Sequence, residues 1–297
     1  MIGQTIRVCA DWKAKDASIV SYHAPDSLED ALAALTSADT RLLGGGTDIF
    51  PPALPGKAPT KILDVTNIRE MRGVSESAAG WRIGAATSWS ELINHPLPPA
   101  FDGLKAAART IGSVQIQNTA TIGGNLCNAS PAADGVPSLL ALEAKVEITS
   151  AAASRWVALE KFLIGPRRVD LKLGEILTAV IIPPHPGKMR SSFLKLGSRK
   201  YLVISIAMVA TLVEFTDSRV RRARLAVGAC SPTALRLRRL ENELRGMHIE
   251  QLSELVVSDD HLRPLSPIND VRGSAEYRLC SVKELIRRAL AEVAEIE

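Results

Sequence analysis

The sequence predicts an α+β fold, with alternating strands and helices in the N-terminal half and a sheet followed by helices in the C-terminal half. In the first half, residues 19–43 contain an apolar run, a helical repeat and a second apolar run, which is the order of a β-α-β unit. In the second half, three apolar runs between residues 193 and 227 precede helical patterns at 233–244 and 281–296. This order is typical of a short antiparallel sheet with helices on one face.

The elements of the N-terminal half follow from the spacing of apolar residues and from the residues that end each run. A helix is predicted over residues 28–35, where Ser27 and Asp30 resemble a capping box. Thr87 or Ser88 can cap another short helix, and the prolines within 51–60 predict an irregular surface crossing. Further helices are predicted at 104–109 and 137–142, and strands at 19–22, 41–43, 61–65, 81–85, 145–148, 156–159 and 175–182.

The chain is predicted to divide after Pro183 and Pro184, which end a strongly apolar strand. Residues 1–184 and 185–297 are therefore expected to form two domains. The last helix of the second domain has a predicted capping box from Ser281 to Glu284. The strands of the second domain are predicted at residues 193–196, 204–215 and 220–227.

Two glycine-rich stretches stand out from this framework. The first is Leu42-Leu43-Gly44-Gly45-Gly46-Thr47-Asp48, and the second is Ala120-Thr121-Ile122-Gly123-Gly124-Asn125. Both predict loops in which the backbone can bring N–H groups close to a phosphate, although tight turns with positive φ would also need glycine. The uncharged residues 111–119 lead into the second stretch and indicate a backbone that lies against another group.

Two common nucleotide-binding motifs are absent. A P-loop needs Gly-Lys-Ser or Gly-Lys-Thr, and neither tripeptide occurs. The Rossmann pattern fails because Ile49 stands where a glycine should follow Gly44 and Gly46. Nucleoside triphosphate and nicotinamide sites of these two kinds are therefore disfavoured.

Composition excludes several other classes of function. The net charge of +4 and the few aromatic residues give little support for nucleic-acid binding. The four cysteines are scattered without a C-x-x-C pair, which argues against a metal site or a disulfide framework. No apolar run is long enough to span a membrane and the N-terminus lacks the pattern of a secretory signal, so a cytoplasmic location is expected. No residue pair suggests acid, base or nucleophilic catalysis, and no metal ligand set is predicted.

The glycine stretches and their surroundings resemble the FAD-binding medium subunit of the molybdenum hydroxylases, the xanthine dehydrogenase and carbon monoxide dehydrogenase family. The resemblance covers residues 42–48, the run 111–126 and the segment Ala129-Ser130-Pro131-Ala132-Ala133-Asp134. It continues at residues 22–35, 63–64, 84–87, 175–177 and 193–199, and so extends over nearly the whole chain.

This resemblance implies a two-part α/β FAD-binding domain of the PCMH type, with parts at about 1–58 and 59–184, followed by a small C-terminal domain. The two stretches would wrap the FAD diphosphate and the isoalloxazine edge, with Ile111, Gly112 and Ile116 along the cleft. Asp134 would accept a hydrogen bond from a ribose or ring group, or would instead cap the following helix. Leu177 would pack on the ring, and Lys195 would lie near the flavin or the adenine. The implied contact residues of the stretches are Leu42, Leu43, Gly44, Gly45, Gly46, Thr47, Asp48, Ala120, Thr121, Gly123, Gly124 and Asn125.

The resemblance also implies a multi-subunit oxidoreductase. A large molybdopterin subunit would oxidise the substrate, and a small subunit with two [2Fe–2S] clusters would relay electrons to FAD in this chain. The FAD would reduce NAD, a quinone, oxygen or a protein, in an assembly expected to be a dimer of heterotrimers. Two alternatives remain open: a stand-alone FAD-dependent oxidase or reductase, and a non-catalytic subunit that has lost FAD. One departure concerns Gln117, because the family usually has arginine at this position.

Overall fold

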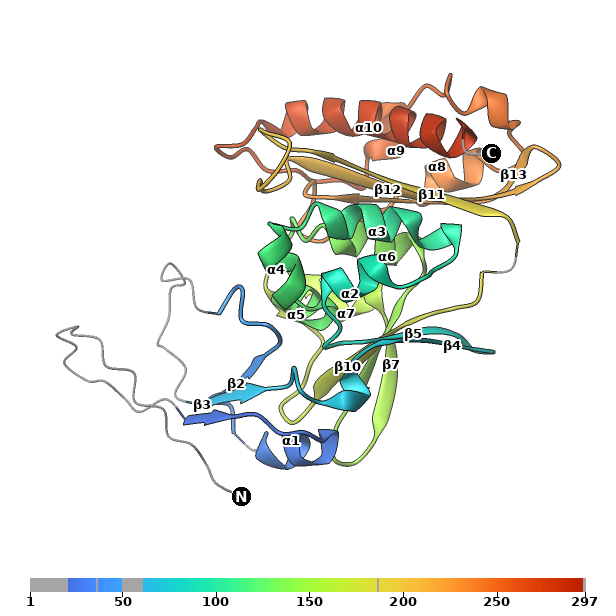
Figure 1. Ribbon diagram of the computed structural model, residues 1–297. Helices are drawn as coiled ribbons and strands as arrows, with labels where there is room; N and C mark the ends of the chain where they lie inside the picture. Colours follow the sequence, from blue (N-terminus) through green and yellow to red (C-terminus); the bar gives the residue numbers. More distant parts are fainter. Residues whose placement is uncertain (1–20, 36, 50–60, 186, 296–297) are drawn as a thin grey trace.

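The structure, a computed structural model, describes residues 21–35, 37–49, 61–185 and 187–295. Figure 1 shows a small sheet at the N-terminal end, a layer of short helices over a second sheet, and a third sheet covered by the C-terminal helix. The predicted α+β fold is confirmed. The predicted surface crossing at 51–60 lies outside the described residues.

The first sheet is the predicted β-α-β unit with one further strand. Strands β1 (Ser21–His23) and β2 (Thr40–Leu43) both run parallel to β3 (Lys61–Asp64), which lies between them. Helix α1 (Leu28–Ala34) has Ser27 as its N-cap, and the Ser27 side chain accepts a hydrogen bond from the Asp30 amide, which is one of the two bonds of the predicted capping box. The first glycine stretch therefore leaves the end of β2.

The second sheet is antiparallel and has its most apolar strand at the centre. All seven residues of β10 (Ile176–Ile182) are buried, which explains why six of the seven are apolar. The strand order is β4-β5-β10-β6-β7, with β4 at Val74–Ser77, β5 at Gly80–Gly84, β6 at Lys145–Thr149 and β7 at Ser154–Ala158. Strand β4 was not predicted, and neither was the ribbon of β8 (Leu163–Gly165) and β9 (Arg168–Val169), which follows helix α7 (Leu159–Phe162).

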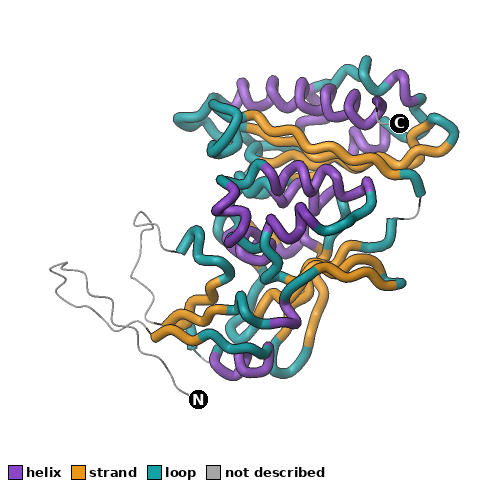
Figure 2. The backbone as a smooth tube through the Cα atoms, viewed as in Figure 1, coloured by secondary structure: helices purple, strands orange, loops and turns teal. Residues whose placement is uncertain are grey.

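Short helices connect β5 to β6 and form a layer between the second and third sheets (Figures 1 and 2). The expected cap of α2 is confirmed at Ser88, which forms a capping box with Glu91. The helices are α2 (Trp89–Asn94), α3 (Asp102–Arg109), α4 (Val114–Thr119), α5 (Ile122–Asn128) and α6 (Gly135–Ala141), and single 3₁₀ turns occur at η1 (Arg69–Met71) and η2 (Pro99–Phe101).

The second glycine stretch was wrongly predicted to be a loop. Thr121 is the N-cap of α5, and Gly123 and Gly124 lie in the first turn of this helix. The Thr121 side chain accepts a hydrogen bond from the Gly124 amide at 3.1 Å. This cap favours the helix, although each glycine in a helix costs about 1 kcal/mol relative to alanine.

The third sheet has four antiparallel strands, in the order β11-β12-β13-β14. Three were predicted, and the fourth, β14 (Leu235–Arg236), falls inside a segment predicted to be helical. The predicted capping box at Ser281 is wrong, because α10 (Ala275–Glu295) begins six residues earlier. The other elements are β11 (Met189–Leu196), β12 (Ala207–Thr216), β13 (Arg219–Gly228), α8 (Arg238–Glu243), η3 (Ile249–Gln251) and α9 (Asp259–Leu262).

Helices cover both faces of this third sheet, although the sequence predicted helices on one face only. Helices α8 and α10 pack on one face, and α3 and α6 from the N-terminal half pack on the other (Figure 1). The buried apolar residues form two clusters, and the sheet separates them. The first cluster therefore contains side chains from both halves of the chain.

Candidate functional site

The two glycine stretches touch each other, although 77 residues of chain separate Gly44 from Thr121. The Thr121 hydroxyl donates to the Gly44 carbonyl at 2.7 Å while it accepts from the Gly124 amide. A Cβ atom on Gly124 would lie 2.9 Å from the Gly44 carbonyl oxygen. Gly45 has φ of +102°, and a Cβ there would lie 2.1 Å from the Thr119 carbonyl oxygen. Close packing of backbone on backbone thus explains these glycines.

The backbone amides of the two stretches differ in what they bind. In the described part of the chain, no acceptor takes a hydrogen bond from the amides of residues 44–48. In the second stretch, the Ile122 amide donates to Thr87 and the Gly123 amide donates to Ala85. The first stretch therefore offers several amide donors to a bound anion, and the second supplies the surface against which the first is held.

A cavity of about 720 Å³ opens where the two stretches meet. This volume is in the usual range for a cofactor site. Of the residues predicted to bind a cofactor, those that line this cavity are Leu42, Gly44, Gly46, Thr47, Asp48, Ile111, Ile116, Ala120, Thr121, Gly124 and Asn125.

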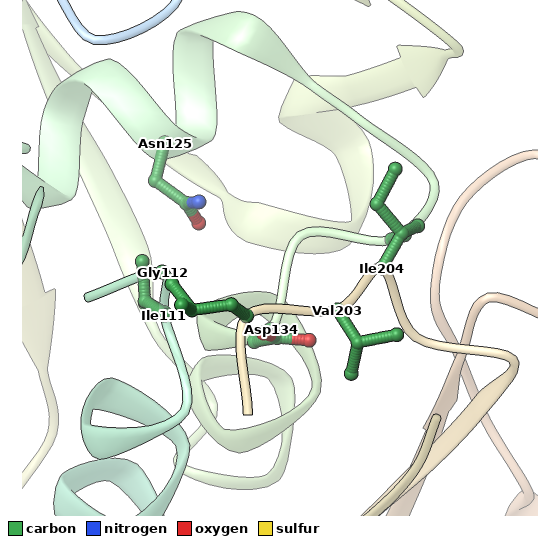
Figure 3. A pocket seen from close by; sticks show the side chains of 8 residues that line it. Ile111, Gly112, Asn125, Asp134, Val203 and Ile204 are labelled. Atoms are coloured by element: carbon green, nitrogen blue, oxygen red, sulfur yellow. The ribbon is translucent and has the colours of Figure 1, made fainter. Parts of the chain in front are cut away.

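A second cavity of about 360 Å³ adjoins the first, since Ile111 and Asn125 line both. Figure 3 shows the Asn125 side chain reaching from its helix towards Ile111 and Gly112, with Asp134 beyond them. Asn125 Oδ1 is buried and has no hydrogen-bond partner among the described residues, and the same is true of Nε1 of Trp89, which lines the larger cavity. A buried acceptor and a buried donor without partners are groups that a bound ligand can satisfy.

Asp134 belongs to a buried polar cluster beneath the smaller cavity. Its carboxylate accepts hydrogen bonds from Lys195 Nζ at 2.6 Å, from Ser205 Oγ at 2.5 Å and from Thr110 Oγ1 at 3.3 Å. Burial raises the pKa of Asp134 above its ordinary value, although Lys195 and the two hydroxyl groups act in the opposite direction. Asp134 stands at the N-cap position of α6, but its side chain makes no capping hydrogen bond to this helix and is bonded to Lys195, Ser205 and Thr110 instead.

Five of the predicted residues line neither cavity: Leu43, Gly45, Gly123, Leu177 and Lys195. Leu177 lies in the core with 3% of its surface exposed, and Lys195 is held by Asp134. A Cβ on Gly123 would lie 2.7 Å from Ala85, so this glycine allows α5 to pack on the second sheet. Gly112 and Asp134 line the smaller cavity. Contacts of all these residues with a cofactor stay predictions.

The cavities also include residues that sequence reasoning missed. Arg41 and Ile49 lie next to a predicted residue along the chain, and Cys127 and Ala132 lie two positions from one, which is a signal that could have found them. Arg167 is different, because it reaches the cavity from the β8–β9 ribbon and has no motif around it. The cavity residues outside the predicted set are Arg41, Ile49, Trp89, Cys127, Asn128, Ala132, Arg167, Leu202, Val203 and Ile204.

Cys127 lines the larger cavity as an uncharged side chain. Burial raises the pKa of its thiol to about 12, so the thiolate is not formed near neutral pH. This environment agrees with the role of a small apolar side chain rather than a nucleophile.

Gln117 has a structural role of its own. Its side-chain amide donates to the carbonyl oxygens of Arg109 and Ile111, both at 3.1 Å. These carbonyls lie at and just beyond the end of α3, where helix carbonyls lack partners within the helix. An uncharged amide thus supplies the donors at a position where a cationic side chain was expected.

Two features are absent from residues 21–35, 37–49, 61–185 and 187–295. Among them, no helix is both long and apolar enough to cross a membrane. The same residues include no cluster of three or more histidine, cysteine or acidic side chains able to hold a metal ion.

A glycine cradle whose first stretch has amides without acceptors among the described residues, beside two cavities that share lining residues, is an arrangement suited to an elongated, phosphate-bearing cofactor. Comparison with known families identifies that cofactor as FAD. Residues 16–185 match the FAD binding domain in molybdopterin dehydrogenase, and residues 192–293 match the CO dehydrogenase flavoprotein C-terminal domain. The chain belongs to the family of FAD-binding medium subunits of molybdenum hydroxylases, the family that its sequence resembles.

Individual relatives match over most of their length. A putative xanthine dehydrogenase FAD-binding subunit of Escherichia coli K12 is 32% identical over 92% of this chain and 95% of the relative. The glyceraldehyde dehydrogenase medium chain of Sulfolobus acidocaldarius is 33% identical over 92% of this chain and 98% of the relative. Among solved structures, a carbon monoxide dehydrogenase from Hydrogenophaga pseudoflava gives a TM-score of 0.84 at 29% identity, covering 93% of this chain and 96% of that chain.

The residues around the cavities fit FAD. The cradle of Gly44 and Gly124 leaves no room for a Cβ at its centre, and amides of the first stretch are available for a diphosphate. Asn125 supplies a buried acceptor, and Trp89 supplies a buried donor.

Proposed function

We propose that this chain is the electron-transfer subunit of a molybdenum hydroxylase, taking electrons from [2Fe–2S] clusters of a small partner subunit and passing them to an external acceptor. Family membership and the joined cavities support the proposal. Bound FAD supplies the redox chemistry. The substrate would be oxidised in a large molybdopterin subunit, and the complete complex would be a dimer of heterotrimers in the cytoplasm.

The single observation that carries the proposal is the cradle where Thr121 holds Gly44 against Gly124. In our proposal the amides of residues 44–48 bind the FAD diphosphate, and the larger cavity extends along the cofactor. Asn125 and Asp134 then lie beside the part of FAD that enters the smaller cavity.

The chain's own task would be binding and orientation rather than acid or base chemistry. Among the described residues that line the cavities, Asp134 is paired with Lys195 and Cys127 is protonated. Neither group is thus a free base beside the cofactor. The apolar side chains Ile111, Ile116 and Ile204 would exclude water from bound FAD.

The first experiment purifies the full chain and records its absorption spectrum. We expect flavin bands, and we expect FAD to be released on denaturation at one molecule per chain. A colourless chain that takes up no added FAD contradicts the proposal.

A second experiment isolates the tagged chain from its native host. We expect it to bring down a molybdopterin subunit and an iron–sulfur subunit, identified by mass spectrometry and by metal content. Substrate must then reduce the flavin in the assembled complex but not in the chain alone. A chain that is isolated alone and oxidises a substrate by itself is a stand-alone flavoprotein instead.

A further inference from the structure

Arg41 and Arg167 are charged residues of the larger cavity that were not among the predicted site residues, and Arg167 is the one whose side chain is bonded to other residues of the cavity wall. It lies in the turn between β8 and β9 with φ of +59°, a backbone conformation that side chains other than glycine rarely adopt. Its amide donates to the carbonyl oxygen of Ala129 at 2.9 Å, just beyond the end of α5. The backbone is thus fixed in an uncommon conformation that places Arg167 on the cavity wall.

The guanidinium group is oriented by two side chains of the cavity wall. Nη1 donates to Asp48 Oδ2 in the first glycine stretch and to Asn128 Oδ1 at the end of α5. Nε and Nη2 donate to no residue in the described part of the chain. One nitrogen is therefore used to orient the group, and the other two keep their hydrogen-bond donors for a ligand.

The charge of the cavity supports a role for these donors. The charged residues that line it are Arg41, Asp48 and Arg167, so the wall carries a net charge of +1. An FAD molecule brings a diphosphate, and its ring can gain negative charge on reduction. The Arg41 side chain makes no hydrogen bond to a described residue, whereas the Arg167 side chain is already oriented, and less freedom is lost when an oriented group binds.

We propose that Arg167 is a binding residue for an anionic group of FAD, an inference that rests on the proposed function. The anionic group is either the diphosphate or the N1–C2=O side of the reduced ring. Both accept hydrogen bonds from a guanidinium group, and charge-assisted bonds of this kind are the strong ones. The two sources differ in when the charge is present, because the diphosphate is always charged and the ring is charged only when reduced.

The test compares Arg167→Gln with the wild-type full chain. Apoprotein is titrated with FAD and with riboflavin, which lacks the phosphates, and the reduction potential of bound FAD is measured. If Arg167 binds the diphosphate, the variant should bind FAD about tenfold to hundredfold more weakly, with riboflavin affinity unchanged. If Arg167 binds the reduced ring, FAD affinity should be retained and the potential should become more negative.

Two further variants complete the design. Arg168→Gln is the matched control, because Arg168 is the next residue along the chain, is exposed and lines neither cavity. Arg167→Lys keeps the charge and should recover part of the lost affinity or potential. The melting temperature of the Arg167→Gln apoprotein should not change, since the ion pair with Asp48 is half exposed.

The inference is overturned if Arg167→Gln changes neither affinity nor potential, or if its only effect is weaker binding together with a less stable apoprotein. That second result means that Arg167 only holds the glycine stretch in place. A wild-type chain that binds no FAD contradicts the proposed function itself, which is a distinguishable failure.

Discussion

A side chain at Gly124 should disturb FAD binding, because it would enter the contact between the two glycine stretches. In Gly124→Val the new Cβ would lie 2.9 Å from the Gly44 carbonyl oxygen and 3.0 Å from the Thr121 hydroxyl, so the two stretches must separate. We expect loss of FAD from a folded chain, with the free energy of unfolding lowered by about 1–3 kcal/mol. FAD content and circular dichroism measure the two effects.

A matched control for Gly124→Val is Gly165→Val, because a Cβ on Gly165 meets no atom within 4 Å and its backbone is not in the positive-φ region. This control should retain FAD. Stoichiometric FAD in Gly124→Val would mean that the cofactor does not depend on the contact between the stretches.

Gln117 makes a second prediction at this scale, about stability rather than binding. Gln117→Leu keeps a similar volume but leaves the Arg109 and Ile111 carbonyls without this donor, and Gln117 is only 8% exposed. We expect the free energy of unfolding in urea to fall by about 1–3 kcal/mol. Gln117→Arg should be much less destabilised, because a guanidinium group can donate to both carbonyls. Equal stability of wild type and Gln117→Leu would show that these two bonds contribute nothing.

The sequence predicted the glycine part of the site and missed its side-chain partners for physical reasons. Glycine stretches are visible because they are contiguous, and eleven predicted residues line the larger cavity. Arg167 contacts Asp48 from 119 residues away, and no local pattern records such a contact. Lys195 and Asp134 were both predicted to face a cofactor, but their mutual ion pair depends on the distance between two folded segments.

At the scale of elements, strands were easier to predict than short helices. Buried strands such as β10 and β12 have runs of apolar residues, whereas α4 and α5 are six and seven residues long, too short to show helical periodicity. Strand β14 was missed because it has only two residues, which are recognised as a strand by their pairing with β13 and not by a local pattern. Tertiary contacts, rather than local propensity, determine whether such short elements form.

The start of α10 gives a prediction that separates the two possible caps. The Ser274 side chain accepts a hydrogen bond from the Tyr277 amide, whereas the Ser281 hydroxyl donates to the Tyr277 carbonyl inside the helix. Ser274→Ala should therefore lower the free energy of unfolding by about 1 kcal/mol. Ser281→Ala should change it by less than about 0.5 kcal/mol, because alanine favours a helix interior. The reverse order in thermal or urea unfolding would place the cap at Ser281.

At the scale of the whole molecule, Glu143 forms ion pairs between the N-terminal half and the third sheet. Its carboxylate accepts from Arg224 at 2.6 Å and from Arg236 at 3.1 Å, both on the third sheet. Burial raises the pKa of Glu143, but the two arginines outweigh this effect and hold the pKa below its ordinary value of 4.5. A carboxyl group whose pKa is lower in the folded state stabilises the fold above pH 4.5, and this contribution is lost as the pH falls through the folded-state pKa.

Glu143→Gln should therefore be less stable than the wild type at neutral pH, and the difference should shrink as the solution is acidified below pH 4.5. Urea unfolding at several pH values measures this change. Glu160→Gln removes a partner of Arg238 from an exposed ion pair and should cost little at any pH. A constant difference for Glu143→Gln across the pH range would contradict the linkage.

The packing of the third sheet decides whether the predicted domains at 1–184 and 185–297 can fold separately. Phe193, Met208 and Leu212 belong to the same buried cluster as Trp89 and Leu104 of the N-terminal half. The opposite face of the sheet packs on α10 in the second cluster. Separation of the halves would thus expose one whole apolar face, at a cost of roughly 25 cal/mol for each Å².

We therefore expect the full chain to unfold in one cooperative transition, with circular dichroism and tryptophan fluorescence giving the same midpoint. A fragment of residues 187–297 should bind a hydrophobic dye and aggregate, because the face that α3 and α6 cover is then exposed. Adding the fragment of residues 1–186 during refolding should suppress both effects. Two separate transitions, or a monomeric C-terminal fragment with a sharp unfolding transition, would show instead that the third sheet is stable without its inner cover.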